Sequence, residues 1–306
     1  MAHRSLFPRP MNRRPRRCSY IVNLDADATG IEVEKVAAYL STLGSAGCEV
    51  VVLDRAAGHL LEGRRRVLRW VGRHEQVHPE TDLLRAAVDL ASNEKIIIAA
   101  PESRYSAEEV SGMCDLLDRF EAVEPEEFVQ PLPWWGGIDA GRILLDRGVA
   151  RHSAHSTFAF RKSAWSPHFS LDVHEAREMF IRREPPVFRS WIRLRQREEA
   201  GEFQAPIRTA FFLCLFPLLL IMALVGGVDL AGAYASLVAF GSVSIAVRGR
   251  IGAAKFFPLR ACLYAPLWVV ERSISAYWAL FARFRRKAAT PEAPENRGNL
   301  ARNTGS

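Results

Sequence analysis

Two long stretches without charge constrain this chain more than any other feature. Thr209–Val228 contains twenty consecutive uncharged residues, and Leu230–Val247 adds eighteen more after the single Asp229. At ~1.5 Å rise per residue, twenty helical residues cover the ~30 Å hydrocarbon core of a bilayer. Core helices of soluble proteins seldom need two such runs back to back. The pattern predicts a transmembrane helical hairpin over residues 209–247.

The positive side chains orient this hairpin. They lie before and after it and are missing from its connecting turn. The residues concerned are Arg193, Arg195, Arg197 and Arg208 on one side, and Arg248, Arg250 and Lys255 on the other. The positive-inside rule places both ends in the cytoplasm. We expect a multi-pass protein of the cell (inner) membrane whose N-terminal domain is cytoplasmic.

The segments around the hairpin predict further membrane contacts. Residues 189–208 have the pattern of an amphipathic interfacial helix, whose arginines could face either lipid phosphates or the diphosphate of a ligand. Residues 248–287 are apolar but interrupted by charge, which predicts interfacial helices. Residues 1–17 form an expected disordered basic arm that contacts anionic lipid head groups. Residues 288–306 are polar and expected to be a disordered tail.

Residues 18–160 alternate between strand-like and helix-like segments. The strand-like segments are Ser19–Leu24, Glu49–Leu53 and Lys95–Ala99, and the helix-like segments are Ile31–Leu43, Glu80–Ser92 and Ala107–Phe120. This alternation predicts an α/β fold, with a parallel-dominated sheet and helices on both faces. Ligands of such sheets bind beyond the carboxyl ends of the strands. The residues at those ends are Asp25 with Asp27, Asp54, and Ala100-Pro101-Glu102.

The composition of the chain limits the classes of partner that it can bind. A net charge of +7 suits nucleic acid, anionic lipid or phosphorylated substrates. No basic patch is interleaved with aromatic residues, so we expect no nucleic-acid partner. The five cysteines stand singly, without metal-ligand spacing, which argues against structural zinc and against a disulfide framework.

Several segments together resemble a known family. They read KIIIAAPESRYSAEEV at 95–110, PLPWW at 131–135, FAFRKSA at 158–164 and RSWIRLRQREEAGEF at 189–203. Their order resembles the family 2 glycosyltransferases, and more closely a membrane-anchored subgroup with C-terminal transmembrane helices. The resemblance implies a GT-A-like glycosyltransferase domain over residues 18–188. It also implies transfer of a sugar from a cytosolic nucleotide-sugar donor to a membrane lipid or lipid-linked acceptor.

The same resemblance assigns roles to residues. Asp54 would contact the nucleotide base, and Asp25 lies in the loop that would cradle the nucleotide. A divalent metal, Mn²⁺ or Mg²⁺, would bind an Asp-x-Asp motif and bridge the departing phosphates. That motif reads Ala100-Pro101-Glu102 here, which leaves Glu102 as the metal ligand. In the alternatives, Glu102 only caps the turn before a helix, and Asp25-Ala26-Asp27 either supplies a relocated ligand or caps its own loop.

The catalytic base is expected to be Glu175, because an inverting transferase needs a carboxylate that deprotonates the acceptor hydroxyl. The alternative is that Glu175 lies on a solvated helix face. The altered motif also supports a second function, in which a catalytically degenerate GT-A-fold protein binds a nucleotide or acts as a scaffold for a membrane partner.

Overall fold

The computed structural model describes residues 17–24, 30–54, 69–72, 80–149, 157–165, 172–192, 195 and 206–289. The expected basic arm and tail lie almost entirely outside these residues. The chain divides into two compact units, each described by itself below. One comprises Met1–Pro186 with Ile245–Cys262, and the other comprises Val187–Ser244 with Leu263–Ser306.

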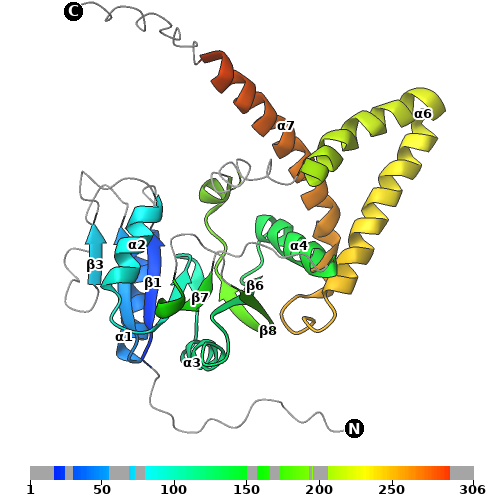
Figure 1. The fold of residues 1–306 in the computed structure, drawn as a ribbon. Helices are drawn as coiled ribbons and strands as arrows, with labels where there is room; N and C mark the ends of the chain where they lie inside the picture. The colour runs from blue at the N-terminus through cyan, green and yellow to red at the C-terminus, as the bar shows by residue number, and fades with distance from the viewer. Residues whose placement is uncertain are drawn as a thin grey trace, which may run out of the picture. The chain divides into compact units, whose positions relative to one another are not determined.

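The first unit is built on one eight-stranded sheet (Figure 1). Its strand order is β3-β2-β1-β4-β7-β6-β8-β5. The bounds are β1 Ser19–Leu24, β2 Glu49–Asp54, β3 Arg69–Gly72, β4 Lys95–Ala99, β5 Ser103–Arg104, β6 Ala122–Val129, β7 Phe158–Arg161 and β8 Val173–Arg183. Strands β1 to β4 pair in parallel, as do β6 and β8. Strands β7 and β5 are antiparallel to their neighbours, so the sheet is mixed rather than purely parallel.

Helices cover both faces of this sheet, as the sequence predicts. The bounds are α1 Gly30–Ser45, α2 Glu80–Leu90 and α3 Ala107–Leu116. Alternate side chains of a strand point to opposite faces. Tyr20, Val22 and Leu24 therefore pack in one core with α1 and α3, whereas Ile21 packs in a second core with α2.

The last turn of the long helix α6 (Pro206–Gly249) belongs to this α/β unit, where it meets α4 (Trp134–Gly148). A Cβ atom on Gly249 would lie 1.9 Å from the carbonyl oxygen of Leu144. One on Gly148 would lie 2.2 Å from the carbonyl oxygen of Ile245. The two helix ends thus touch backbone to backbone, which only glycine permits.

The chain after α6 continues this packing. The ring of Phe256 stacks on Phe180 of β8 with centroids 4.2 Å apart, and it also meets Phe128 of β6 at 5.0 Å. Arg147 of α4 donates from Nε to the carbonyl oxygen of Gly249 over 3.1 Å. Residues 245–262 therefore complete the hydrophobic packing of the α/β unit, although they comprise the last turn of the apolar helix and the chain after it.

The second unit contains most of α6. Gly227, with φ 68° and ψ −163°, interrupts this helix in a backbone region that is open essentially only to glycine. The helix bends there into two arms (Figure 1), each of about 21 residues and ~32 Å long. Large apolar side chains on both arms are exposed, with Val228 at 87 % and Phe240 at 73 %. Within the described residues, α6 is the one helix that is long and apolar enough to cross a membrane.

Helix α7 (Ala265–Ala289) packs beside the first arm of α6. Trp268 meets Phe212 edge to face at 5.5 Å, and Tyr277 meets Phe216 at 6.3 Å. An exposed apolar stripe runs along α7. It comprises Leu267, Val270, Ile274, Trp278 and Phe281. The segment 248–287, expected to form interfacial helices, thus consists of a turn region packed in the first unit and one long helix in the second.

Candidate functional site

The strand order creates a switch point between β1 and β4. From β1 the chain moves outward to β2 and β3, then returns to place β4 on the opposite side of β1. The connections leave the carboxyl ends of β1 and β4 in opposite directions. Ligands of α/β sheets bind in the crevice outside the strand ends at such a switch point. The ends of β1 and β4, at Leu24 and Ala99, therefore mark the candidate site.

Three of the expected site residues follow strands at this edge. Asp54 is the last residue of β2 and pairs with Leu24, the last residue of β1. Glu102 lies in the turn that begins two residues after the end of β4. Asp25 directly follows β1 but lies outside the described residues, and the side chain of Asp54 is likewise not described.

The helix that follows Glu102 has a cap of its own. Helix α3 begins at Ala107, and its N-cap is Ser106, whose side chain accepts a hydrogen bond from the backbone N–H of Glu109 at 3.2 Å. The Glu109 carboxylate accepts in return from the backbone N–H of Ser106 at 2.6 Å. With this capping box complete, Glu102 is not the cap of α3.

Glu175 lies elsewhere in the sheet. Its neighbour His174 pairs with Val123, and Ala159 of β7 joins Val123 to Ile97 of β4 in one continuous row. Continuing this register by one residue sets Glu175 level with Ile98, the last residue but one of β4. Glu102 is joined to the opposite end of β8, where Arg183 pairs with Ser103 and Val129. Glu175 pairs with Glu124, five β6 residues before Val129, or about 16 Å at ~3.3 Å per residue. The register therefore keeps Glu175 away from Glu102.

The surroundings of Glu175 are a separate surface feature. Its carboxylate accepts from the guanidinium of Arg177, with Nε at 2.9 Å. An open hollow of about 670 Å³ lies here, lined by residues that include Arg119, Phe120 and His174. The His174 ring stacks flat on Phe120 at 3.7 Å. The alternative that Glu175 lies on a solvated helix face is wrong, since the residue lies on strand β8.

The segment after β4 is held rigidly. Thr157 donates from its hydroxyl to the carbonyl oxygen of Ile98 at 2.9 Å, and its oxygen lies 2.7 Å from the hydroxyl of Tyr105. The backbone N–H of Ser103 donates to the carbonyl of Ala100 at 3.0 Å, which closes the turn around Glu102. The position of the altered motif is therefore fixed by buried contacts on both sides.

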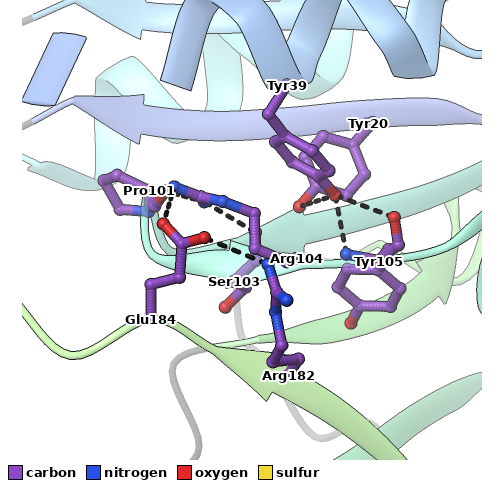
Figure 2. Close-up of polar contacts among 8 residues, drawn as sticks. All are labelled: Tyr20, Tyr39, Pro101, Ser103, Arg104, Tyr105, Arg182 and Glu184. Atoms are coloured by element: carbon purple, nitrogen blue, oxygen red, sulfur yellow. Dashed lines mark hydrogen bonds and ion pairs between the residues drawn. The ribbon is translucent and has the colours of Figure 1, made fainter. Parts of the chain in front are cut away.

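Three tyrosines line the sheet beside this segment (Figure 2). The hydroxyl of Tyr39 accepts from the backbone N–H of Tyr105 at 2.7 Å and lies 3.4 Å from the hydroxyl of Tyr20. Burial raises the pKa of Tyr39 to about 12 and also raises the pKa of Tyr20 and of Tyr105. All three remain neutral phenols at physiological pH, so they can donate or accept hydrogen bonds but do not serve as bases there.

An arginine pair shares one carboxylate at the same place (Figure 2). Arg104 Nη2 lies 2.9 Å from Oε2 of Glu184, and Arg182 Nη2 lies 3.1 Å from Oε1. Arg104 also donates to the carbonyl oxygens of Pro101 and Ser103, and its guanidinium sits 4.9 Å above the ring of Tyr39. The backbone N–H of Glu184 donates to the carbonyl oxygen of Glu102 at 2.9 Å. This cluster is therefore joined to the altered motif by main-chain and side-chain bonds.

Two consecutive glutamates of β6 are buried beside it. Glu127 lies 3.6 Å from Nη1 of Arg183 and accepts from the hydroxyl of Ser103 at 3.4 Å. Glu126 points to the other face and lies 2.6 Å from Nη1 of Arg147. Burial raises the pKa of Glu126, although Arg147 acts in the opposite direction.

The residues described at the altered motif do not fit a divalent metal. Mn²⁺ and Mg²⁺ take oxygen ligands, normally with at least two carboxylates in such a site. Glu102 is the one carboxylate within Ala100-Pro101-Glu102, and the carbonyl oxygen of Pro101 already accepts a hydrogen bond from the guanidinium of Arg104. In the described part of the chain, no three His, Cys, Asp or Glu side chains gather as metal ligands.

Sequence reasoning missed Tyr39, Arg104, Arg182 and Glu184. One signal was available in the sequence. Arg104 is a cation only two residues after Glu102, close to a motif that lacks its first carboxylate. The partnership of Arg104 with Glu184 spans eighty residues and left no local pattern to read.

Comparison with known proteins gives distant likenesses only. No protein-family model and no curated protein sequence matches the chain. Among solved structures it is similar to a mannosyltransferase from Pyrobaculum calidifontis in complex with GDP-Man and Mn²⁺, with 15% identity, 87% of this chain and 88% of that chain covered, and a TM-score of 0.46. It is also similar to S. aureus TarS 1-349, with 13% identity, 48% of each chain covered and a TM-score of 0.35.

A third likeness is to glucosyl-3-phosphoglycerate synthase from Mycobacterium tuberculosis in complex with Mn²⁺, uridine-diphosphate and glucosyl-3-phosphoglycerate. It has 17% identity, 48% of this chain and 57% of that chain covered, and a TM-score of 0.34. At these scores the likeness establishes neither the fold nor the activity of this chain.

Proposed function

We propose that this protein is a membrane-associated glycosyltransferase that moves a sugar from a nucleotide-sugar donor to a lipid or lipid-linked acceptor. The observation that carries the proposal is the switch point between β1 and β4, bordered by the strand ends that lead to Asp25, Asp54 and Glu102. A nucleotide bound there would lie across the carboxyl edge of the parallel strands.

The residues at this edge would divide the work. Asp54 would accept hydrogen bonds from the nucleotide base, and the loop that begins at Asp25 would enclose the nucleotide. Glu102 would face the phosphates or the sugar. We assign no catalytic base, because Glu175 lies about 16 Å along the sheet from the end of β8 that is joined to Glu102.

The acceptor class follows from the apolar helix. Each arm of α6 matches the ~30 Å thickness of a bilayer core, and its exposed leucines, valines and phenylalanines would face lipid. The apolar stripe on α7 has the spacing of a helix that lies in the interface. A transferase held in this way would work where the hydroxyl or phosphate of a lipid acceptor is exposed. The proposed location is a cell membrane, with the α/β unit in the cytoplasm.

A second candidate function is a catalytically degenerate protein that binds a nucleotide, or a partner in the membrane, without transferring sugar. Two observations favour it. The altered motif provides Glu102 in place of two aspartates, and Glu175 is remote from Glu102.

The test uses the full chain in detergent or nanodiscs. Binding of a panel of nucleotide sugars is measured by calorimetry, and release of nucleoside diphosphate is measured in the presence of membrane lipid extract. We expect binding of at least one nucleotide sugar, weakened at least about tenfold in Asp54→Ala. Asp89→Ala, at an exposed position of α2, is the control and should bind like wild type. Binding without release would favour the degenerate protein, and no binding of any nucleotide sugar would rule out the transferase.

A further inference from the structure

The structure places a pair of arginines, Arg104 and Arg182, beside the altered motif Ala100-Pro101-Glu102. We propose that Arg182, supported by Arg104, binds the diphosphate of the donor, so that donor binding needs no divalent metal. The inference rests on the proposed function, because it assigns the charge that the same crevice would present to the same ligand.

Two like charges face each other across the edge of the sheet. Strands β5 and β8 pair so that Arg104 lies directly opposite Arg182. Directly opposed like charges destabilise a sheet. Glu184 offsets one of them by lying between the two guanidinium groups, at 2.9 and 3.1 Å. The trio keeps one net positive charge, and an anion bound beside it would relieve the remaining repulsion.

The two arginine side chains differ in their exposure to solvent, which separates their roles. The Arg104 side chain is only 11% exposed, and its donors are used by the carbonyls of Pro101 and Ser103. The Arg182 side chain is 46% exposed. A guanidinium has five N–H donors, and a single contact to Glu184 leaves most of those of Arg182 for a ligand. Arg182 is therefore the binding group, and Arg104 is its positioning residue through Glu184.

The arginine pair lies next to the altered motif. The backbone N–H of Glu184 donates to the carbonyl oxygen of Glu102 at 2.9 Å, so the end of β8 is tied to the altered motif itself. Arg104 stands two residues beyond Glu102 on the turn that follows β4. A diphosphate placed at the switch point would thus lie next to this arginine pair.

The chemistry of the pair suits this ligand. Guanidinium groups bind phosphate oxygens through two parallel N–H bonds, and such charge-assisted bonds are about twice as strong as neutral ones. Since the motif lacks its aspartates, an arginine supplies without a metal the positive charge that a diphosphate requires. The ligand class recognised is a nucleoside diphosphate or its sugar ester.

The experiment measures binding of GDP, UDP and inorganic pyrophosphate to the full chain in detergent by calorimetry. Each titration is run in EDTA and again in excess Mg²⁺ or Mn²⁺. We expect similar affinity in both conditions and a loss of at least about tenfold in Arg182→Ala. Arg182→Lys should lose less affinity, because lysine keeps the positive charge but not the two parallel N–H donors of the guanidinium.

Arg177→Ala is the matched control. Arg177 lies on the same strand, is 48% exposed and pairs with Glu175, much as Arg182 pairs with Glu184. It should leave every affinity unchanged. Thermal unfolding of each variant separates a binding loss from a folding loss, and Arg182→Lys keeps the charge if the alanine variant is unstable.

Three outcomes separate the anion site from the donor site. Binding that disappears in EDTA, returns with Mg²⁺ or Mn²⁺ and is unaffected by Arg182→Ala would show a metal site and overturn the inference. Arg182-dependent binding of pyrophosphate without binding of either nucleoside diphosphate would support the anion site and count against the glycosyltransferase. If none of the three probes binds, the anion site and the donor site are both ruled out.

Discussion

The two halves of the sheet are stabilised by different forces. In β1, β2 and β4 the buried side chains described are almost all apolar, and no charged side chain described there is buried. In β6 and β8 the interior holds charges, including Glu126, Glu127 and Arg183. The first half relies on burial of apolar area, which is tolerant of shape. The second relies on paired charges, each of which is strongly destabilising if its partner is removed.

The proposed ligand site lies between the apolar half and the charged half of the sheet. The switch point lies in the apolar half, whereas the arginine pair that we assign to the diphosphate is attached to β8 in the charged half. Stability and ligand binding would therefore respond to different substitutions on the two sides of β4.

The largest expected effect is at the buried pair of Glu127 and Arg183. Glu127→Ala leaves Arg183 buried without this carboxylate, so we expect a loss of about 3–5 kcal/mol in the free energy of unfolding, measured by denaturant titration in detergent. The double variant Glu127→Leu with Arg183→Met should regain most of the loss. Glu175→Ala, which breaks the partly exposed pair with Arg177 on the same strand, should change stability by less than about 1 kcal/mol. Equal losses in the two single variants would refute the contrast.

The next effect is at the contact of α4 with the last turn of α6. Gly249→Ala introduces a Cβ 1.9 Å from the carbonyl oxygen of Leu144, and the overpacking should cost about 1–3 kcal/mol of unfolding free energy. Gly241→Ala on the same helix is the control, since nothing lies within 4 Å of its Cβ. A wild-type melting temperature for Gly249→Ala would mean that these backbones do not touch.

A smaller effect is expected in the apolar half. Ile97 is fully buried in β4, and Ile97→Val removes one methylene group in a core that can adjust. We expect a loss of about 0.5–1.5 kcal/mol, measured by the same denaturant titration. Glu127→Gln, an equally conservative change in the charged half, should cost more. The reverse order would show that the two halves are held in the same way.

The smallest effect concerns pH. Hydrogen bonds from the hydroxyl and backbone N–H of Ser163 lower the pKa of Glu94 below its ordinary 4.5. A lowered pKa contributes stability above pH 4.5 that is lost as the pH falls through the folded value. Ser163→Ala should therefore lower the melting temperature at pH 7 by no more than about 2 °C, because Glu94 is exposed. The variant and wild type should converge in acid, and a difference that persists there would assign Ser163 another role.

The same contrast explains which elements could be predicted. Strands β1, β2 and β4 were readable because their apolar runs resemble buried parallel strands. Strands β6 and β8 were not predicted, because AVEPEEFV and VHEAREMFIRR carry charges at positions that a pattern reads as solvent-facing. Those charges are tolerated because of Arg147 and Arg183, which are distant in sequence from their partners on β6.

The candidate site was predictable to a similar extent. The strand ends at Asp54 and near Glu102 followed from the apolar runs alone. The remote position of Glu175 depended on the unpredicted pairing of β6 with β8. The arginine pair depended on β5, a two-residue strand too short to leave any periodicity.

The division of the α/β unit into two stretches of sequence has a consequence for its synthesis. Residues 245–262 supply Gly249 and Phe256 to that unit, but the ribosome makes them after most of the apolar helix. A nascent chain cannot finish packing the sheet until α6 has emerged, so membrane insertion precedes completion of the α/β unit if α6 inserts as it is made. A fragment cut before α6 would lack the partner surface of α4 and would be a poor substitute for the whole chain.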